Sequence, residues 1–267
     1  MSITEKRTAD GKSTYAEAGS STPLVLLHAF PLSKAMWQPQ LAALSDIARV
    51  LAVDLPGFGG SRGFDGAPSI DAMADRVAQF LDALHISEPI VLGGLSMGGY
   101  VSLAFARRHA NRLRALILAD TKADADDETA KANRDKMIAL VQQSGSSAVV
   151  DQMIPRLIGA DTRSHNPEIV AGTRLIGAAQ TPAGIAAALQ AMRDRPDASP
   201  SLASIPVPTL VVVGAQDEVT PLAKAEALQR AISGAQLVTI SGAGHLSSLE
   251  QPDAFNAAMR TFIGGVR

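Results

Sequence analysis

The chain has 267 residues, of which 46% are hydrophobic, and this length suits one large α/β domain or a core with a single insertion. Its formal net charge of −2 gives no electrostatic reason for binding nucleic acid or an anionic membrane surface. The sequence contains no cysteine, which excludes disulfides, thiolate nucleophiles and thiolate metal sites.

The N-terminal residues and the hydropathy pattern indicate where in the cell the protein is expected. Residues 1–7 contain no apolar segment of the kind that forms a secretory signal. No uninterrupted apolar run approaches the ~20 residues that are needed to span a bilayer. We therefore expect a cytoplasmic protein that does not associate with membranes.

The first part of the chain alternates between strands and helices. A polar hairpin that turns at Asp10–Gly11 comes first. Continuous apolar runs, which are typical of strands buried on both faces, follow at 24–27, 50–53, 90–92 and 116–119. Helices are expected between them at 37–44, 69–84 and 99–109, the second with Ser69 as its N-cap.

The pattern changes after residue 121. Residues 122–200 contain no strand-like run and instead show alanine-rich stretches typical of helices, at 126–143, 146–158, 167–179 and 182–193. Strands then return at 208–214 and 236–240, with helices at 221–232 and 251–263. This order predicts an α/β core of residues 1–121 and 201–267, a mostly parallel sheet with helices on both faces, and a helical cap inserted at 122–200.

The most informative motif is Gly94-Leu95-Ser96-Met97-Gly98, which follows the apolar run 90–92 and precedes a helix. In such a turn the two glycines allow the backbone to pack tightly on both sides of the serine. The serine hydroxyl then lies at a helix N-terminus, where negative charge is favoured. Ser96 is therefore the candidate nucleophile.

A serine hydroxyl needs a neighbouring base and an acid that orients the base, and both should lie at the carboxyl ends of other strands. His245 follows the last strand and is the candidate base, and Asp217 follows the strand at 208–214 and is the candidate acid. The order serine, aspartate, histidine is that of an α/β-hydrolase triad. Asp120, which ends the strand at 116–119, and Glu218 are the alternative acids.

The same chemistry needs hydrogen-bond donors for the oxyanion of the tetrahedral intermediate. We expect one donor to be the backbone N–H of Met97, directly after the nucleophile. The second should come from the loop after the strand at 24–27, where Phe30 is the candidate because Pro31 has no N–H.

The binding pocket is expected between the core and the cap, and to be mostly apolar. No pair of histidines has the spacing of metal ligands, and we expect neither a metal nor a cofactor. Five arginines of the insertion could bind a substrate carboxylate or could lie in solvent: Arg156, Arg163, Arg174, Arg193 and Arg195. The candidate pocket residues, for each of which ordinary packing is the alternative, are Trp37, Met137, Leu140, Met153, Leu157 and Leu175.

Taken with these motifs, the whole chain resembles the α/β-hydrolases, and within them the small capped bacterial enzymes of the 3-oxoadipate enol-lactonase and carboxylesterase type. The segments that match are 27–31, 54–59 and 94–99, Gly214 with Asp217, and Gly244 with His245. The resemblance implies that His28 holds the oxyanion loop through hydrogen bonds to the backbone and that Asp54 fixes a loop. Ala29 departs from the pattern, because many relatives have glycine there.

These features predict a serine hydrolase that cleaves carboxylic esters or lactones with small to medium acyl groups through an acyl-enzyme. Two reactions on the same triad remain alternatives: cofactor-free perhydrolysis of the haloperoxidase type, and hydrolysis of a carbon–carbon bond. A non-catalytic binding protein on a hydrolase fold is a more distant one. The expected partner is a small-molecule substrate, and a homo-oligomer is compatible with the sequence.

Overall fold

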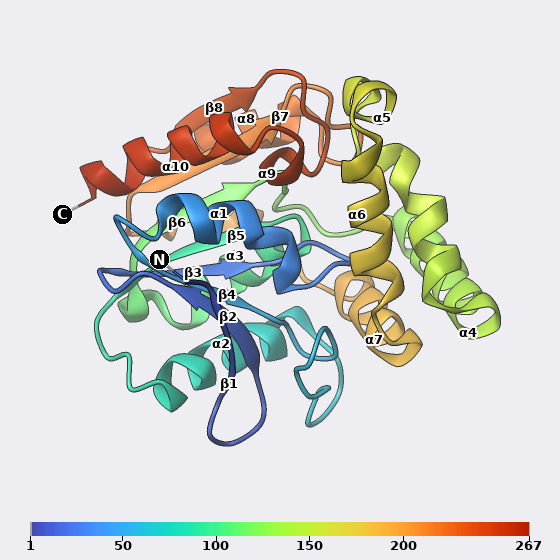
Figure 1. Ribbon diagram of the computed structural model, residues 1–267, viewed down its shortest axis with the longest axis horizontal. Coiled ribbons are helices and arrows are strands. Elements are labelled where there is room, and N and C mark those ends of the chain that lie inside the picture. The colour runs from blue at the N-terminus through green and yellow to red at the C-terminus, as the bar shows by residue number, and fades with distance from the viewer. Residues whose placement is uncertain (1, 267) are drawn as a thin grey trace.

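A sheet of eight strands forms the centre of the protein, as the computed structural model shows for residues 2–266 (Figure 1). The strand order is β1-β2-β4-β3-β5-β6-β7-β8. The pairs β1–β2 and β2–β4 are antiparallel, and all other pairs are parallel. The strands are β1 (Thr4–Arg7), β2 (Thr14–Ala18), β3 (Pro23–Leu27), β4 (Arg49–Val53), β5 (Ile90–Leu95), β6 (Leu113–Ala119), β7 (Thr209–Gly214) and β8 (Gln236–Ile240).

Helices cover both faces of this sheet, which confirms the α/β class and the mostly parallel sheet that the sequence predicts. One face carries α1 (Gln38–Leu44) and α10 (Pro252–Gly265). The other carries α2 (Ile70–Ala83), α3 (Met97–Arg108) and α8 (Leu222–Ala231). No helix among residues 2–266 is both long and apolar enough to cross a membrane.

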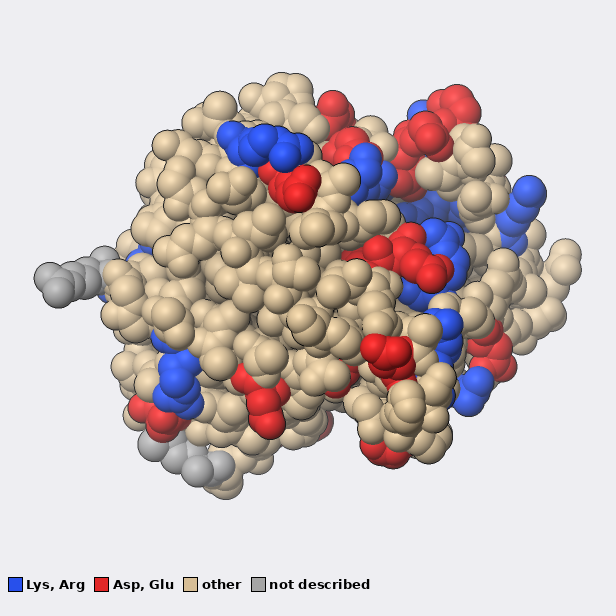
Figure 2. Space-filling model, turned by 90° about the horizontal axis from the view of Figure 1, so that it is seen from above, with Lys and Arg blue, Asp and Glu red and all other residues tan. Residues whose placement is uncertain are grey.

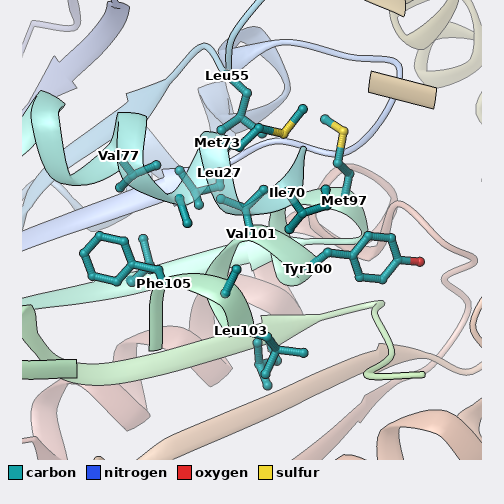
Figure 3. Packing of buried hydrophobic residues seen from close by; sticks show 14 of the residues in the cluster. Leu27, Leu55, Ile70, Met73, Val77, Met97, Tyr100, Val101, Leu103 and Phe105 are labelled. Atoms are coloured by element: carbon teal, nitrogen blue, oxygen red, sulfur yellow. The ribbon is translucent and has the colours of Figure 1, made fainter. Parts of the chain in front are cut away.

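The two-sided covering explains why the strands read as continuous apolar runs. In β3, Leu24 and Leu26 belong to the cluster beneath α1 and α10, whereas Val25 and Leu27 belong to the cluster beneath α2 and α3. Successive side chains of a strand point to opposite faces, so both must be apolar when both faces are buried. Figure 3 shows the second cluster, where Leu27 lies among side chains of α2 and α3.

A helical segment follows β6 and lies at one side of the sheet (Figure 1). It consists of α4 (Glu128–Leu157), α5 (Ala160–His165), α6 (Pro167–Ala178) and α7 (Pro182–Arg193). The two helices expected at 126–143 and 146–158 both lie within α4, which is kinked between them at Gly145, where the backbone is not helical and φ is 78°. The sequence did not indicate α5. The boundaries of an inserted cap at 122–200 stay a prediction.

Short helices occupy several connections: η1 (Lys34–Trp37), η2 (Ala110–Arg112), η3 (Ser199–Ser204) and α9 (Ser247–Glu250). Of these, η1 follows the loop after β3, and α9 follows the loop after β8. Both loops therefore lie at the carboxyl edge of the sheet. The loops after β5 and β7 lie at the same edge, because β3, β5, β7 and β8 run in the same direction.

Candidate active site

Ser96 lies in a tight turn between β5 and α3. Its φ of 55° and ψ of −112° are unusual for a residue with a side chain. A Cβ on Gly94 would lie 2.1 Å from the carbonyl oxygen of Gly98, and a Cβ on Gly98 would lie 2.2 Å from the carbonyl oxygen of Leu27. Only glycine fits at these two positions, so the spacing of the motif follows from the backbone contacts of the turn.

Residues at the end of β6 hold this turn from the other side. The backbone N–H of Ser96 donates to the carbonyl oxygen of Ala119 at 2.9 Å, and the hydroxyl of Thr121 donates to the carbonyl oxygen of Ser96 at 2.9 Å. The serine itself is 9% exposed. Its hydroxyl is thus fixed at the N-terminus of α3, with a small opening to solvent.

The structure brings the side chains of Ser96, His245 and Asp217 together. Nε2 of His245 lies 2.8 Å from Oγ of Ser96, and Nδ1 of His245 lies 2.8 Å from Oδ2 of Asp217. An ionised carboxylate can only accept, so Nδ1 carries the proton and donates it to Asp217. Nε2 is then free to accept from the serine hydroxyl, which is the arrangement a general base requires.

Asp217 is held by a turn formed with the residues that directly follow it. Its Oδ1 accepts from the backbone N–H of Val219 at 2.8 Å and of Thr220 at 2.9 Å, and its Oδ2 accepts from the hydroxyl of Thr220 at 2.6 Å. Burial alone would raise the pKa of Asp217, but the charge and hydrogen bond of His245 and the bonds from Thr220 hold it below its usual value. A threonine three residues after the aspartate was the available signal, because Asp side chains often bond to the backbone just ahead.

Among residues 2–266, neither alternative acid is a hydrogen-bond partner of the His245 ring. Oδ1 of Asp120 accepts from the backbone N–H of Gly214 at 2.8 Å, and its Oδ2 accepts from the hydroxyl of Ser247. Burial, and then the nearby charge of Asp217, raise the pKa of Asp120 well above its usual value. Glu218 is exposed. Asp120 therefore joins the loops after β7 and β8 behind the site.

The loop that carries His245 rests on the helical segment. The carbonyl oxygen of Leu157, at the end of α4, accepts from the backbone N–H groups of His245 and Leu246, each at 3.1 Å. The carboxylate of Glu250 accepts from Leu246 N–H at 3.1 Å and from Gly159 N–H at 2.8 Å. Sequence reasoning missed Glu250, which looks like an ordinary acidic residue of a short helix.

The two backbone N–H groups expected at the oxyanion belong to buried residues: Met97 is fully buried, and Phe30 is 3% exposed. Neither N–H donates to a protein acceptor among residues 2–266. For Met97 this follows from its place in the first turn of α3, where N–H groups have no partner within the helix. No protein acceptor among residues 2–266 therefore occupies either donor.

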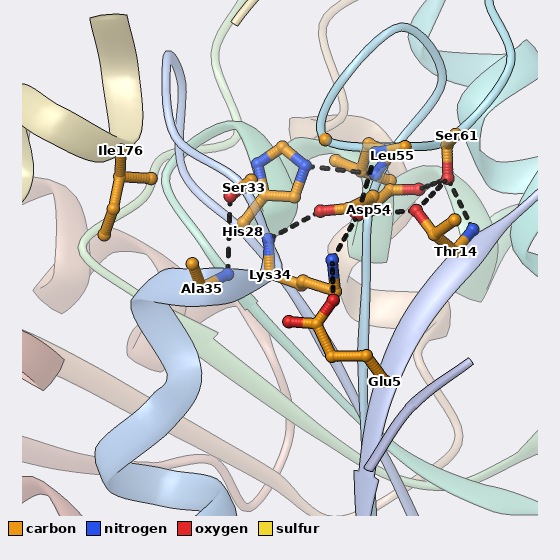
Figure 4. A network of polar contacts seen from close by, with 12 residues as sticks. Glu5, Thr14, His28, Ser33, Lys34, Ala35, Asp54, Leu55, Ser61 and Ile176 are labelled. Atoms are coloured by element: carbon orange, nitrogen blue, oxygen red, sulfur yellow. Dashed lines mark hydrogen bonds and ion pairs between the residues drawn. The ribbon is translucent and has the colours of Figure 1, made fainter. Parts of the chain in front are cut away.

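His28 holds the loop after β3 through two hydrogen bonds to the backbone (Figure 4). Its Nδ1 donates to the carbonyl oxygen of Ala29 at 3.0 Å, and its Nε2 accepts from the backbone N–H of Leu55 at 3.0 Å. Burial lowers its pKa, which favours the neutral ring that this pattern needs. In the same network Asp54 accepts from the backbone N–H of Lys34 at 2.8 Å and from its ammonium group at 2.9 Å.

A pocket of about 410 Å³ lies between α3, α4 and the loop after β7. Its apolar lining includes three of the expected residues, Met137, Met153 and Leu157, together with Val219. Leu140 packs against the larger core cluster and is not among the residues that line this pocket.

Two expected pocket residues lie elsewhere, and their assignment was wrong. The ring of Trp37 packs against the ring of Phe255 on α10, with centroids 6.1 Å apart, and only 1% of the residue is exposed. It belongs to the core on the α1 and α10 face of the sheet. Leu175, on α6, is 73% exposed and faces outward, because α6 packs through Thr173 and Gly177.

Charged residues surround the pocket. Lys122, Arg134, Lys136 and Arg156 line it together with one carboxylate, that of Asp126. Figure 2 shows Lys and Arg side chains, with acidic ones beside them, gathered around a hollow at the side of the helical segment. Within residues 2–266, no cluster of three or more His, Asp or Glu side chains is placed to hold a metal ion.

Comparison with known proteins gives consistent results. A family model described as alpha/beta hydrolase fold matches residues 22–252. The 3-oxoadipate enol-lactonase 2 of Acinetobacter baylyi is 30% identical over 261 residues, 98% of this chain and 95% of the relative. A pimeloyl-[acyl-carrier protein] methyl ester esterase of Neisseria meningitidis is 32% identical over 256 residues, 91% of this chain and 93% of the relative.

Solved structures give the same result in three dimensions. A thermophilic esterase of Thermogutta terrifontis, solved with malate bound, superposes with a TM-score of 0.92 at 39% identity. The superposition covers 100% of this chain and 99% of the esterase. A family match over most of the chain, with relatives that span almost its full length, establishes that this protein belongs to the alpha/beta hydrolase fold family.

Proposed function

We propose that this protein is a serine hydrolase that cleaves carboxylic esters or lactones of small to medium acyl groups through an acyl-enzyme on Ser96. The observation that carries the proposal is the hydrogen-bonded chain from Ser96 through His245 to Asp217, with both contacts at 2.8 Å. The names of the relatives, an enol-lactonase and esterases, agree with this class of reaction.

In the first half of the reaction, Nε2 of His245 takes the proton of the Ser96 hydroxyl while Oγ attacks the carbonyl carbon. The carbon–oxygen bond to the alcohol then breaks, and His245 gives its proton to the departing oxygen. In the second half, His245 takes a proton from water, hydroxide attacks the acyl carbon, and the proton returns to Oγ as the acid leaves. Asp217 fixes the ring and stabilises the charged imidazolium.

The N–H groups of Met97 and Phe30 stabilise the oxyanion that forms in both halves. Their lack of a protein acceptor among residues 2–266 supports this role, because donors that are already oriented need no rearrangement during the reaction. The pocket of about 410 Å³ beside α4 accommodates the acyl group.

The test is hydrolysis of p-nitrophenyl acetate, butyrate and octanoate by the wild type and by Ser96→Ala. We expect the variant to lose about 10⁴-fold or more in kcat, as for other members of such a triad. Ser164→Ala is the matched control, because this serine is exposed on α5 and bonds only to the carbonyl oxygen of Ala160. If Ser96→Ala still hydrolyses the esters, while a serine-directed phosphonate abolishes hydrolysis by the wild type, then another serine is the nucleophile.

A second candidate function is favoured by the charges of the pocket: hydrolysis of esters or lactones that carry a carboxylate. Lys136 and Arg156 line the pocket, and neither has a carboxylate within 4.0 Å among residues 2–266, whereas Arg134 lies 3.0 Å from Asp126. Cations without an acidic partner can bind a substrate anion. One relative is named for 3-oxoadipate, itself a dicarboxylate.

Matched esters separate the two candidates. Mono-p-nitrophenyl glutarate and p-nitrophenyl valerate have acyl chains of equal length and differ in the terminal carboxylate. A carboxylate-directed enzyme should prefer the glutarate at low salt, and this preference should fall in Lys136→Gln with Arg156→Gln. A general esterase should prefer the valerate and should be little affected by these substitutions.

A further inference from the structure

Tyr100 lies between two pockets of the protein. The pocket of about 410 Å³ beside α4, here termed the front pocket, and a second pocket of about 160 Å³, termed the rear pocket, are both lined by Tyr100 and Lys122. Only 7% of Tyr100 is exposed. In Figure 3 its ring extends from α3 away from the packed side chains of Val101 and Phe105.

Three residues that line the front pocket, Tyr100, Leu157 and Val219, lie next to parts of the candidate site. Tyr100 lies in the first turn of α3, and its backbone N–H donates to the carbonyl oxygen of Ser96 at 3.2 Å. Val219 donates its N–H to the carboxylate of Asp217, and Leu157 accepts from the N–H of His245. All three of these lining residues are therefore one step removed from the side chains that we assign to the reaction.

The rear pocket is lined by apolar residues and also by charged ones, among them Asp71, Arg107 and Asp197. Ile70, Leu103, Ala104 and Pro196 line it, with Ala104 one turn after Tyr100 on the same helix. None of these four residues lines the front pocket. The apolar part of the rear pocket thus offers space for an alkyl chain, and Tyr100 lines both pockets.

The ring of Tyr100 is fixed by a buried arginine. The guanidinium carbon of Arg195 lies 4.1 Å from the ring centroid, a cation–π contact. The Arg195 side chain is 3% exposed, lies 2.8 Å from Asp126, and donates to the carbonyl oxygens of Met192 and Asp124 at 2.7 and 2.8 Å. Because these contacts hold the guanidinium group of Arg195, the ring of Tyr100 that packs against it is also held in place.

We propose that Tyr100 is the end wall of the acyl site and that it limits the length of acyl chain this enzyme accepts. The inference rests on the proposed ester hydrolysis and adds its specificity-determining residue. An acyl chain that extends from Ser96 along the front pocket meets the ring of Tyr100, and the space behind it stays closed because Arg195 covers the ring.

The test is a series of p-nitrophenyl esters from acetate to decanoate with wild type, Tyr100→Phe and Tyr100→Ala. Tyr100→Ala joins the two pockets, so kcat/KM for octanoate relative to butyrate should rise by about tenfold or more, as expected when added methylenes enter an apolar pocket. Tyr100→Phe keeps the ring and should keep the wild-type preference. If Tyr100→Ala lowers kcat/KM for all the esters by one common factor, Tyr100 does not limit the length of the acyl chain.

A second substitution tests whether the rear pocket receives the chain. Ala104→Leu places a larger side chain in the rear pocket only. In the Tyr100→Ala background it should return the preference to shorter chains, whereas in the wild-type background it should change the preference by less than about twofold. If Ala104→Leu changes the chain-length preference equally in the wild-type and Tyr100→Ala backgrounds, the inference is wrong. Tyr100→Leu replaces Tyr100→Ala in this cycle if the alanine variant does not fold.

Failure of the inference and failure of the proposed function give different results. Without Ser96-dependent hydrolysis of any ester by the wild type, the proposed function is wrong. The wall is then tested by calorimetric binding of 2-alkanones of four to ten carbons, which needs no turnover. Tighter binding of the long ketones to Tyr100→Ala than to Tyr100→Phe supports the wall, and equal affinities overturn it.

Discussion

At the scale of single residues, Asp217 shows how a carboxylate is kept both ionised and oriented in a buried site. Each of its oxygens accepts two hydrogen bonds, one of them from His245. The backbone bonds fix the carboxylate plane before substrate arrives, so the imidazole needs no reorganisation. Thr220 contributes twice, through its backbone and its hydroxyl, and is a supporting residue of the acid.

The first prediction concerns this acid. Asp217→Asn should lower kcat for p-nitrophenyl butyrate by about 10⁴-fold, because an amide in this place favours the wrong tautomer of the histidine. The neighbouring exposed Glu218 provides the control, since Glu218→Gln should leave kcat within about twofold. Retention of more than a tenth of the wild-type kcat in Asp217→Asn would show that another group orients His245.

Single residues also show where sequence reasoning stops. The strand ends that carry Ser96 and Asp217 could be located because each follows an apolar run, and the one that carries His245 because it follows the last strand-like segment, 236–240. Trp37 and Leu175 were misplaced because a large apolar side chain does not reveal which surface it packs against. The outward face of α6 is decided by Gly177, where a Cβ would lie 2.6 Å from a methyl carbon of Val150 on α4.

At the scale of elements, the strands and the helices of the core were predictable, since their periodicity is set by two buried faces. The helical segment was predictable only as a set of helices. Its break at Gly145 coincides with an expected one, but the short helix α5 has no periodic apolar pattern of its own and depends on packing against neighbours. Among the cations of α4 that line the front pocket, Arg156 was one of five arginines that the sequence offered, whereas Lys136 was not singled out, because the face that α4 turns to the pocket depends on the same packing.

One buried ion pair connects the two ends of the helical segment. Arg195, after α7, pairs with Asp126, before α4, and their side chains are 3% and 2% exposed. We expect Arg195→Met to lower the free energy of unfolding by about 3 kcal/mol, because it leaves a buried carboxylate with fewer partners. Arg193→Met, which breaks exposed pairs only, should cost less than about 1 kcal/mol. Denaturant unfolding measures both free energies. Equal losses in the two variants would mean that the buried pair contributes no more to stability than the exposed pairs do.

The same pair predicts a pH dependence of stability. Burial of Asp126 by itself would raise its pKa, but the positive charges of Arg134 and Arg195 hold the pKa below its usual value. A carboxyl group whose pKa is lower in the folded state stabilises the protein above its unfolded pKa, about 3.9, and this contribution is lost as the pH falls through the folded pKa. The difference in unfolding free energy between wild type and Asp126→Asn should therefore be largest near pH 7 and should shrink below about pH 4. A difference that is constant from pH 7 to pH 3 would contradict this assignment.

At the scale of the whole molecule, the helical segment contacts the core through pairs of glycines. A Cβ on Gly184, in α7, would lie 2.0 Å from the carbonyl oxygen of Gly57, and a Cβ on Gly244 would lie 2.3 Å from the backbone nitrogen of Gly159. The second contact lies directly beside His245. Backbone therefore packs on backbone at two places, which fixes the distance between the helices above the site and the strand ends below it.

The final prediction tests whether this close approach sets the shape of the pocket. Gly184→Ala must push α7, and α4 packed against it, away from the core, since the backbone of Gly57 cannot yield to an added methyl group. We expect this overpacking to lower the free energy of unfolding by about 1–3 kcal/mol and to raise KM for p-nitrophenyl butyrate. The change in kcat should be smaller, because Ser96, His245 and Asp217 all lie on the core.

Gly172→Ala, in α6, is the matched control, because no atom lies within 4 Å of the added Cβ. Alanine should therefore stabilise the helix by about 0.5–1 kcal/mol and leave KM unchanged. A Gly184→Ala protein with wild-type KM and stability would mean that the helical segment moves freely against the core, and that the pocket takes its final shape only when substrate binds.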